Sequence, residues 1–481
     1  MRQQYLDIYN THMELYPYEK DDIPIIEADY TAIDKFTNKE FPCGYTISNG
    51  KLYLPRGTSI SKIETIASVK ANKNNESDPY EKMDYIHSSL YEPRNEIQEE
   101  SIKFLTEDPF KQKGLNLATG IGKTFCVAYA STKLGLKTII ITPNEMLKEQ
   151  WINTYSKMFD YRPKHLMNIA GSNIIESFMQ DLIEPADVYF VNHQTLRSYL
   201  MSHNEYEFHQ FFKKLGVGIK VYDESHMEFA NILFIDFFTN TENTWYLTAT
   251  FDRSDKTESK CFKRAFSSVV CYGEIESKEV VRKHVIYHTV NFDSRISPKH
   301  RAKLLAYPGY TSNRYGQYAF EWDPNESAYK VIREILLKIK DIEGKTLIFV
   351  PLIDNVEQVV SNIKRDFPEK TVGAYHSKIP KDEKESAEKK DIIVSTIKSC
   401  GTGRDIKGLR CVICAEPVAS KVIAEQMIGR LRPYADDKDT YFFDCVDTCI
   451  THNNWWWKSR FKKIQTLVKE VKYLTVDKLS Y

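Results

Sequence analysis

The stretch LATGIGKTF, residues 117–125, decides the fold because it is one position short of a phosphate-binding loop. The full pattern is G-x-x-x-x-G-K-[ST], and Leu117 stands where the pattern has its first glycine. Glycines let backbone N–H groups close around phosphate, and a helix begun at the lysine points its positive end at the same anion. The positions that would contact phosphate are Thr119, Gly120, Ile121, Gly122, Lys123 and Thr124. Alone, the stretch fits a nucleotide site or a glycine-containing turn, so its surroundings have to decide.

The flanking sequence gives the strand, loop and helix order that a phosphate loop requires. The run KGLNLAT precedes the loop, and the helical segment KTFCVAYASTKLG follows it. Four further runs are continuously apolar: 137–143, 186–192, 219–225 and 244–250. Continuous rather than alternating runs are typical of parallel strands buried on both faces. We therefore expect an α/β domain with a parallel sheet over residues 86–280.

The same pattern then repeats without a second phosphate loop. Four more apolar runs cover 345–351, 391–396, 410–416 and 440–446. Helical segments such as VIREILLKIKD separate them. This alternation predicts a second parallel-sheet domain over residues 326–450.

Three segments lie outside the two α/β domains. Residues 1–85 contain GYTISNGKLYLPRGTSI, two alternating runs around Asn49-Gly50 that predict a hairpin in a small α+β accessory domain. The polar run 71–82 is typical of a linker. Residues 281–325 form an irregular, basic and tyrosine-rich connecting segment, and 451–481 form a basic tail that we expect to be helical.

Composition limits the possible partners and compartments. The 66 Lys and Arg balance 66 Asp and Glu, so a nucleic-acid binder of this composition must use local basic faces. Nine scattered cysteines without disulfide spacing suit a reducing compartment. We see no apolar run long enough to span a membrane and no signal peptide. We therefore expect a cytoplasmic protein without a membrane partner.

The run VYDESH, residues 221–226, ends a predicted strand in two carboxylates. Asp223 at the carboxyl end of a strand can hold magnesium, directly or through water, and Glu224 can polarise an attacking water. An acidic loop is the alternative, but the phosphate loop in the same predicted sheet favours the catalytic reading. His226 has no partner histidine at helical spacing, so we expect no zinc there. Cys411 and Cys414 lie three apart in a predicted strand and should face opposite sides, which also disfavours a metal site.

The motifs ATGIGKT, DESH, LTAT and QMIGR, in this order, resemble those of the superfamily 2 helicases. The resemblance covers roughly residues 90–450 and implies a core of two RecA-like domains. Within the superfamily, TPNEMLKEQW, DESH and the SCGTGRD segment are similar to the transcript-release helicases of poxviruses and the recombination helicases of phages. Members of both groups are compact, with a small N-terminal domain before the motor. The resemblance implies a viral or phage origin and hence the host cytoplasm.

The resemblance also implies roles for individual residues. Gln98 would contact adenine, and Gly403 and Asp405 would lie near the nucleotide. Positions that would meet the nucleic-acid strand are Thr142, Pro143, Asn144, Gln194, Thr195 and Thr396. Positions that would couple the nucleotide state to domain motion are His226, Thr248, Thr250 and Gln426.

The arginine motif departs from the family pattern Q-x-x-G-R-x-x-R. Gly429 and Arg430 fit the pattern, but position 433 is proline and the second arginine is Arg432. Either arginine could stabilise charge on the transferring phosphate, or the pair could lie at the surface in a salt bridge with an acidic residue. We expect Arg430 to be the principal finger and Arg432 a secondary contact.

Two further regions could bind nucleic acid outside the motor. Residues 297–318 interleave cations with tyrosines, and 453–463 contain three consecutive tryptophans. Cations meet phosphates and rings stack on bases, but a solvated loop and simple packing are the alternatives. On a helix each residue turns by about 100°, so the three tryptophans cannot share one face and at least one should pack on the second motor domain.

The sequence therefore predicts an ATP- and Mg²⁺-dependent superfamily 2 helicase, with the nucleotide in the cleft between the two α/β domains. We expect DNA rather than RNA as the partner, branched or forked intermediates as substrates, and a monomer. One alternative is a translocase that remodels transcription or protein–DNA complexes without separating strands. The other is a non-enzymatic nucleic-acid-binding protein with an inactive ATPase fold.

Overall fold

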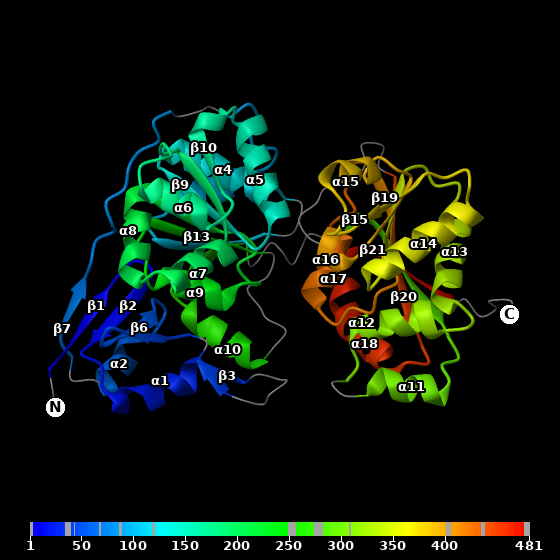
Figure 1. Ribbon diagram of the computed structural model, residues 1–481, viewed down its shortest axis with the longest axis horizontal. Helices are drawn as coiled ribbons and strands as arrows, with labels where there is room; N and C mark the ends of the chain where they lie inside the picture. The colour runs from blue at the N-terminus through cyan, green and yellow to red at the C-terminus, as the bar shows by residue number, and fades with distance from the viewer. Residues whose placement is uncertain are drawn as a thin grey trace. The chain divides into compact units, whose positions relative to one another are not determined.

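The computed structural model describes residues 3–33, 40–42, 44–66, 69–85, 89–117, 121–248, 256–273, 282–306, 309–400, 406–433 and 438–475. The chain divides into two compact units, Met1–Ser277 (unit 1) and Lys278–Tyr481 (unit 2) (Figure 1).

Unit 1 is built on a seven-stranded sheet in which every pairing is parallel, in the order β10-β11-β9-β12-β13-β8-β14. Its strands are β8 (Gln112–Asn116), β9 (Thr138–Thr142), β10 (Leu166–Ile169), β11 (Val188–Asn192), β12 (Ile219–Tyr222), β13 (Asn243–Thr248) and β14 (Val270–Tyr272). The four apolar runs that follow the phosphate loop are confirmed as strands β9, β11, β12 and β13. Neighbouring residues Ile139 and Ile140 enter separate apolar cores on opposite faces, as expected for a strand covered on both sides.

Helices cover both faces of this sheet (Figure 1). They are α3 (Glu96–Glu107), α4 (Lys123–Leu134), α5 (Glu145–Met158), α6 (Ser172–Met179), α7 (His193–Ser202), α8 (Glu205–Leu215), α9 (Phe229–Asp236) and α10 (Lys256–Ala265).

The N-terminal part of unit 1 is a small mixed sheet in the order β5-β6-β2-β1-β7. It consists of β1 (Gln4–Ile8), β2 (His12–Tyr16), β5 (Thr46–Ser48), β6 (Lys51–Pro55) and β7 (Val69–Asn74), with helices α1 (Ile23–Tyr30) and α2 (Ile60–Ile66) and the pair β3 (Thr31–Ile33) and β4 (Glu40–Pro42). The predicted hairpin is confirmed, because β5 and β6 are joined through Asn49 and Gly50, which have φ of 51° and 72°. The linker expected from 71–82 is wrong at its start, since β7 pairs in parallel with β1.

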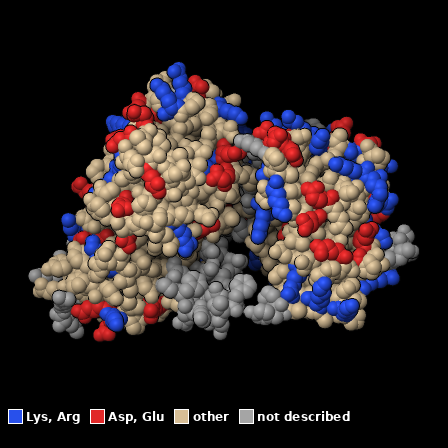
Figure 2. Space-filling model, viewed as in Figure 1, with Lys and Arg blue, Asp and Glu red and all other residues tan. Residues whose placement is uncertain are grey.

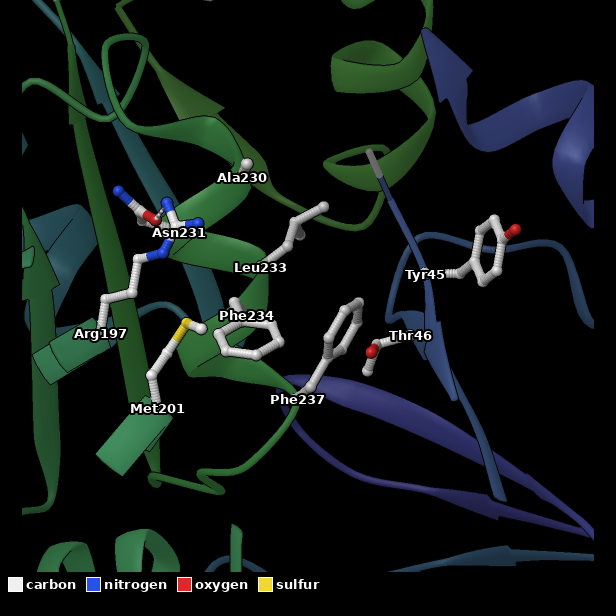
Figure 3. Close-up of a pocket in the computed structure, with 9 residues that line it drawn as sticks. All are labelled: Tyr45, Thr46, Arg197, Met201, Ala230, Asn231, Leu233, Phe234 and Phe237. Carbon is white, nitrogen blue, oxygen red and sulfur yellow. Dashed lines mark hydrogen bonds between the residues drawn. The ribbon is translucent and has the colours of Figure 1, made fainter. Parts of the chain in front are cut away.

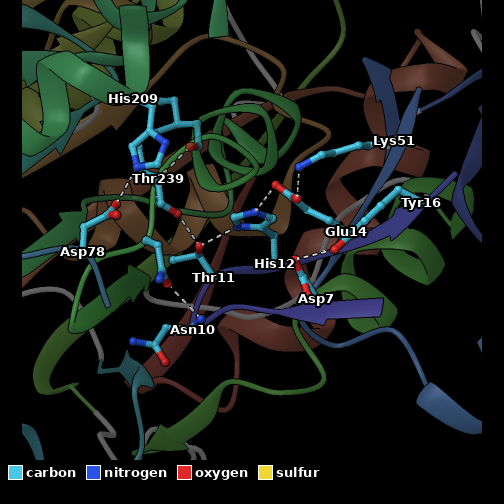
Figure 4. Close-up of polar contacts among 12 residues, drawn as sticks. Asp7, Asn10, Thr11, His12, Glu14, Tyr16, Lys51, Asp78, His209 and Thr239 are labelled. Carbon is cyan, nitrogen blue, oxygen red and sulfur yellow. Dashed lines mark hydrogen bonds and ion pairs between the residues drawn. The ribbon is translucent and has the colours of Figure 1, made fainter. Parts of the chain in front are cut away.

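This small sheet shares its core with the motor domain. Leu54 and Phe237 belong to one buried cluster, and polar contacts close the seam (Figure 4). The Asn10 N–H donates to Asn240 Oδ1 at 2.9 Å, and the Thr11 hydroxyl donates to the Thr239 carbonyl. Because apolar and polar contacts coincide, the N-terminal part and the motor domain form one compact body.

Unit 2 contains a second seven-stranded, all-parallel sheet in the order β17-β18-β16-β19-β20-β15-β21. Its strands are β15 (Arg282–Phe292), β16 (Lys345–Phe349), β17 (Val372–Tyr375), β18 (Ile392–Ser395), β19 (Leu409–Cys414), β20 (Thr440–Asp447) and β21 (Val468–Thr475). Its helices are α11 (Pro298–Leu305), α12 (Ser312–Gln317), α13 (Ser327–Lys338), α14 (Ile353–Asp366), α15 (Lys381–Ala387), α16 (Ile397–Cys400), α17 (Lys421–Ile428) and α18 (Thr451–Ile464).

Three strands of unit 2, β15, β17 and β21, lie where the sequence predicts none. Strand β15 begins the segment expected to be irregular, and β21 follows the helix α18 in the tail expected to be helical. Charged and histidine residues interrupt the apolar character of β15, and β21 carries two exposed lysines, Lys469 and Lys472, as edge strands often do. The two α/β domains are nevertheless the predicted tandem parallel-sheet domains. No helix in the part of the chain that the structure describes is long and apolar enough to cross a membrane.

Candidate functional site

The end of the phosphate loop is shaped by Gly122 and Gln98. Helix α4 begins at Lys123, as expected, and Gly122 precedes it with a φ of 101°. A Cβ at Gly122 would lie 2.6 Å from Gln98 Nε2, so only glycine fits there. The buried Gln98 amide accepts a hydrogen bond from the Arg94 N–H at 2.9 Å and donates one to the Ile121 carbonyl at 2.5 Å. Gln98 therefore holds the loop itself, while its contact with adenine stays a prediction.

Leu117 explains how the loop tolerates a missing glycine. Its side chain is 1% exposed and belongs to the core beside β8. Its carbonyl oxygen accepts a hydrogen bond from Lys123 Nζ at 2.7 Å. The Leu117 side chain thus packs in the core of the sheet. It does not occupy the space in which backbone N–H groups would bind phosphate. Thr119 and Gly120 lie outside the described residues.

Asp223 is a buried carboxylate directly after β12. Trp151 Nε1 donates to its Oδ2 at 2.8 Å, and the Glu224 N–H donates to its Oδ1 at 2.9 Å. Burial and the neighbouring Glu224 charge raise the pKa of Asp223 to about 6, against the Trp151 bond and the Lys123 charge. Strands β8, β13 and β12 are parallel neighbours, so the phosphate loop after β8 and the DESH segment after β12 lie at the same edge of the sheet.

Glu224 has a φ of 48°, which is unusual for a residue with a side chain. Such a conformation costs about 1–3 kcal/mol and is concentrated at functional sites. His226 Nδ1 lies 3.4 Å from Glu224 Oε2 and 3.0 Å from Thr248 Oγ1, at the end of β13. The structure thus brings three predicted residues into contact. Thr250, the other predicted coupling residue of this segment, lies outside the described residues.

These groups fit a nucleoside triphosphate with a divalent metal. The first N–H groups of α4 and the Lys123 ammonium suit phosphate oxygens. The Thr124 hydroxyl and the Asp223 carboxylate supply the oxygen ligands that Mg²⁺ prefers. Thr124 and Asp223 are therefore the candidate metal ligands.

The residues of unit 1 that are predicted to contact nucleic acid include both buried and exposed ones. Thr142 is fully buried at the end of β9 and donates to Asn192 Oδ1 at 2.9 Å. Asn144 caps α5 by accepting from the Leu147 N–H at 2.9 Å. Gln194 is exposed on α7, whereas Pro143 and Thr195 are partly exposed. A bound nucleic-acid strand would therefore contact Gln194, while Thr142 and Asn144 hold the neighbouring backbone in place.

A hollow of about 240 Å³ opens further along α7, between this helix, α9 and the N-terminal part (Figure 3). Arg197 lines it one turn after Gln194 and donates to Asn231 Oδ1 at 2.9 Å. Tyr45 and Phe237 close it from the accessory sheet and from the end of α9. The hollow thus borders the segment predicted to contact a strand.

In unit 2, Thr396 follows β18 and is 7% exposed. Its hydroxyl donates to Ser399 Oγ at 2.9 Å, so it shapes the start of α16. Gln426 is buried in α17, and its Nε2 has no hydrogen-bond partner among the described residues. Gly403 and Asp405 lie outside the described residues.

Both arginines of the shortened motif lie beyond the end of their helix. Helix α17 ends at Ile428, and the chain continues through a turn. Arg430 is 5% exposed and Arg432 is partly exposed. Because the helix has ended, the shift of the second arginine by one position does not turn its side chain by the rotation of about 100° per residue that a helix would give. The assignment of Arg430 as the finger stays a prediction.

Sequence reasoning missed two residues that organise the site. Trp151 shares a helical face with Leu147 and Tyr155, a pattern that predicts only core packing. Asn192 accepts from Thr142 and donates to Glu145 Oε1, joining β9 to β11. In the sequence, the position of Asn192 at a strand end, next to the HQTL segment, was the only indication of this role.

Two family models match the chain. Residues 88–253 match "Type III restriction enzyme, res subunit", and residues 327–432 match "Helicase conserved C-terminal domain". Each match falls on one of the two parallel-sheet domains. The chain belongs to the superfamily 2 helicases and translocases, and these domains imply an ATP-hydrolysing enzyme that uses a divalent metal, typically Mg²⁺.

Among curated proteins, the transcript termination protein A18 of Yaba monkey tumor virus is 22% identical over 351 residues, 67% of this chain and 65% of the relative. The same protein of Yaba-like disease virus is 22% identical over 344 residues, 66% of this chain and 64% of the relative. The chain thus spans less than two thirds of the length of these relatives.

Among solved structures, S. cerevisiae Dbp5 bound to RNA and ADP BeF3 is similar with a TM-score of 0.56 and 14% identity. The similarity covers 79% of this chain and 90% of that chain, and it supports the tandem-domain fold. T4 UvsW aligns over 98% of this chain and 99% of that chain, with 14% identity and a TM-score of 0.38.

Proposed function

We propose that the chain is an ATP-driven motor that moves along a nucleic-acid strand and separates DNA at branched or forked sites. The observation that carries the proposal is the meeting of the DESH segment with β13 beside Lys123. Glu224, His226 and Thr248 are in contact there, and the Lys123 charge acts on Asp223. Backbone strain is concentrated at switch regions, and contacts from an acid to a neighbouring strand end can carry the state of a bound nucleotide.

Each residue has a role in this proposal. Lys123 and the N-terminus of α4 bind the β- and γ-phosphates, and Glu224 orients and deprotonates the attacking water. Thr124 and Asp223 would hold a divalent metal, which would neutralise phosphate charge. His226 passes the state of Glu224 to Thr248, and Arg430 of unit 2 stabilises charge on the transferring phosphate.

The preference for DNA rests on the resemblance of the motifs to phage recombination helicases. The rival function, remodelling of transcription complexes without strand separation, is favoured by the A18 relatives, which are transcript termination proteins. A non-enzymatic role is disfavoured because Lys123, Asp223 and Glu224 are all present.

Steady-state ATP hydrolysis tests the proposal, with single-stranded, duplex and forked DNA and RNA of the same sequence as stimulants. We expect the largest stimulation with forked DNA and none in Lys123→Ala. Strand displacement is measured on the same substrates. Greater stimulation by RNA would overturn the DNA preference, and hydrolysis without displacement would favour the remodelling translocase.

A further inference from the structure

Two segments far apart in sequence meet on unit 2 and form an aromatic cluster of Tyr310, His452, Trp455 and Trp456. The Tyr310 ring stacks on His452 with centroids 4.8 Å apart and meets Trp456 edge-on at 5.0 Å. His452 lies 5.3 Å from Trp455, which is 60% exposed. The cluster therefore presents at least one large ring at the surface of unit 2.

Helix α18, which carries His452, Trp455 and Trp456, is held to the rest of unit 2 by buried contacts. Arg460 donates from Nε and an amino nitrogen to both carboxylate oxygens of Asp444 in β20, at 3.0 and 2.7 Å. It also donates to the Val418 carbonyl at 2.7 Å, while Trp457 stacks on Phe461 with centroids 4.9 Å apart. Trp457 is thus the packing tryptophan, and Trp455 is held out on a rigid helix.

The helices around the cluster are basic in a chain whose overall charges balance, although Arg460 is paired with Asp444 and Lys463 with Glu425. Helices α11, α12 and α18 contain no Asp or Glu. Their basic residues are Lys299, Arg301, Lys303, Arg314, Lys458, Arg460, Lys462 and Lys463. Figure 2 shows Lys and Arg side chains gathered over α11. Trp455, Lys458 and Lys462 are exposed at helical spacing i, i+3 and i+7, so one face of α18 carries a ring followed by two cations.

The cluster also lies near Thr396, which is predicted to contact the nucleic-acid strand. Ser312 Oγ, two residues after Tyr310, donates to Glu416 Oε1 at 2.7 Å. The Ile397 N–H, directly after Thr396, donates to the same carboxyl group. Tyr310 and Thr396 are therefore close in sequence to Ser312 and Ile397, which both donate to the Glu416 carboxyl group.

We propose that this aromatic cluster is a stacking platform for single-stranded nucleic acid, a role that rests on the proposed function. A base stacks on Trp455, whose orientation the Tyr310–His452–Trp456 packing fixes, and Lys458 and Lys462 bind the adjoining phosphates. Stacking tolerates any base because every base has a flat face, and phosphates supply the charge that the basic helices complement. The platform lengthens the strand path from Thr396 across unit 2.

Fluorescence anisotropy of a labelled oligo-dT about 12 nucleotides long, within the site size of such grooves, tests the platform. Loss of one stacked base costs about 1–3 kcal/mol, so Trp455→Ala should weaken binding about 5- to 150-fold. The matched control is Tyr206→Ala, which removes a ring that is 70% exposed on α8 of unit 1 and should leave affinity unchanged. Unfolding curves of both variants should match the wild type, because both rings are exposed.

A second probe separates stacking from charge. An abasic strand of the same length keeps its phosphates, so Trp455→Ala should bind it as the wild type does. Lys458→Ala should instead lower the slope of log K against log salt by about 0.7 on both strands. Equal affinity of Trp455→Ala and wild type for oligo-dT overturns the platform, while DNA-stimulated hydrolysis in the wild type still upholds the proposed motor. Absence of both binding and stimulation in the wild type overturns both.

Discussion

Glu224 has the most constrained environment among the predicted catalytic residues. Its backbone N–H is bonded to Asp223, its φ is positive, and its carboxylate lies beside His226. The backbone bond from Glu224 helps to fix the Asp223 carboxylate. In the proposed function, these two acids, adjacent in sequence, have separate roles, Asp223 as a metal ligand and Glu224 as the base.

The division of labour between Lys123 and Glu224 gives the first prediction. Lys123→Ala should weaken ATP binding and abolish turnover, because the ammonium contacts the phosphates in the ground state as well. Glu224→Gln should still bind ATP but turn it over more slowly, by on the order of 10²-fold or more, because only the base is lost. Titration with a fluorescent ATP analogue and steady-state hydrolysis check both. Near-normal turnover in Glu224→Gln would show that another group activates the water.

Glu416 gives a pH prediction. Burial of its carboxyl raises its pKa from 4.5 to about 7, against the bonds from Ser312 and Ile397 and the Lys398 charge. The native state then keeps a proton between about pH 4.5 and 7 that the unfolded state releases. Stability is therefore lost as pH rises through this window.

We expect Glu416→Gln to remove this part of the pH dependence and to stabilise unit 2 above pH 7 by up to about 3 kcal/mol. Urea unfolding at pH 5, 6, 7 and 8 measures the effect. Glu343→Gln, at a side chain that is 90% exposed, is the control and should leave the profile unchanged. A Glu416→Gln profile parallel to that of wild type would contradict the prediction.

At the scale of elements, strands with a continuous apolar run were easier to predict than strands whose apolar residues are interrupted by polar ones. The runs at 186–192 and 410–416 are continuously apolar, and both form central strands. The expectation for Cys411 and Cys414 is confirmed, because they enter different cores on opposite faces of β19. Strand β21 lies at the sheet edge and exposes Lys469, Glu470 and Lys472, so its sequence has no continuous apolar run.

The attachment of α18 gives an element-scale prediction. Arg460→Ala leaves Asp444 charged and buried without its partner, so unit 2 should lose about 3–5 kcal/mol of stability. Replacing both residues with apolar ones, as Arg460→Met with Asp444→Leu, should cost much less, because no charge stays buried. Urea unfolding followed by circular dichroism measures both, with the exposed Lys458→Ala as a control expected within about 0.5 kcal/mol of wild type. A loss for the double variant as large as that for Arg460→Ala would mean that the side-chain packing of Arg460 matters more than its charge.

At the scale of the whole molecule, the predicted machinery is shared between the two units. Lys123, Asp223 and Glu224 belong to unit 1, and the arginine pair belongs to unit 2. Motif order alone predicts this division, since each motif is a short local pattern. The roles of Arg430 and Arg432 could not be derived in the same way, because they depend on where the helix ends, and helix ends are weakly encoded in sequence.

The last prediction concerns that pair. An arginine finger is worth about 10³–10⁵ in turnover in related phosphoryl transfer. Arg430 follows Gly429 in the family's register and keeps a hydrogen-bonded turn, its N–H donating to the Met427 carbonyl at 3.1 Å. Arg432 lies two residues further on, next to Pro433, where proline fixes the backbone away from the helical region. The better-anchored Arg430 is therefore the better finger. Arg430→Ala should nearly abolish hydrolysis while ATP binding is retained, and Arg432→Ala should do less.

Turnover numbers at saturating ATP and DNA decide between the two arginines. Arg430→Lys is the informative companion, because it keeps the charge but lacks the planar fork, so a partial rescue would identify charge as part of the effect. A larger loss in Arg432→Ala than in Arg430→Ala would reverse the assignment. If neither substitution slowed hydrolysis, the catalytic groups would all reside in unit 1, and unit 2 would act only by holding the strand.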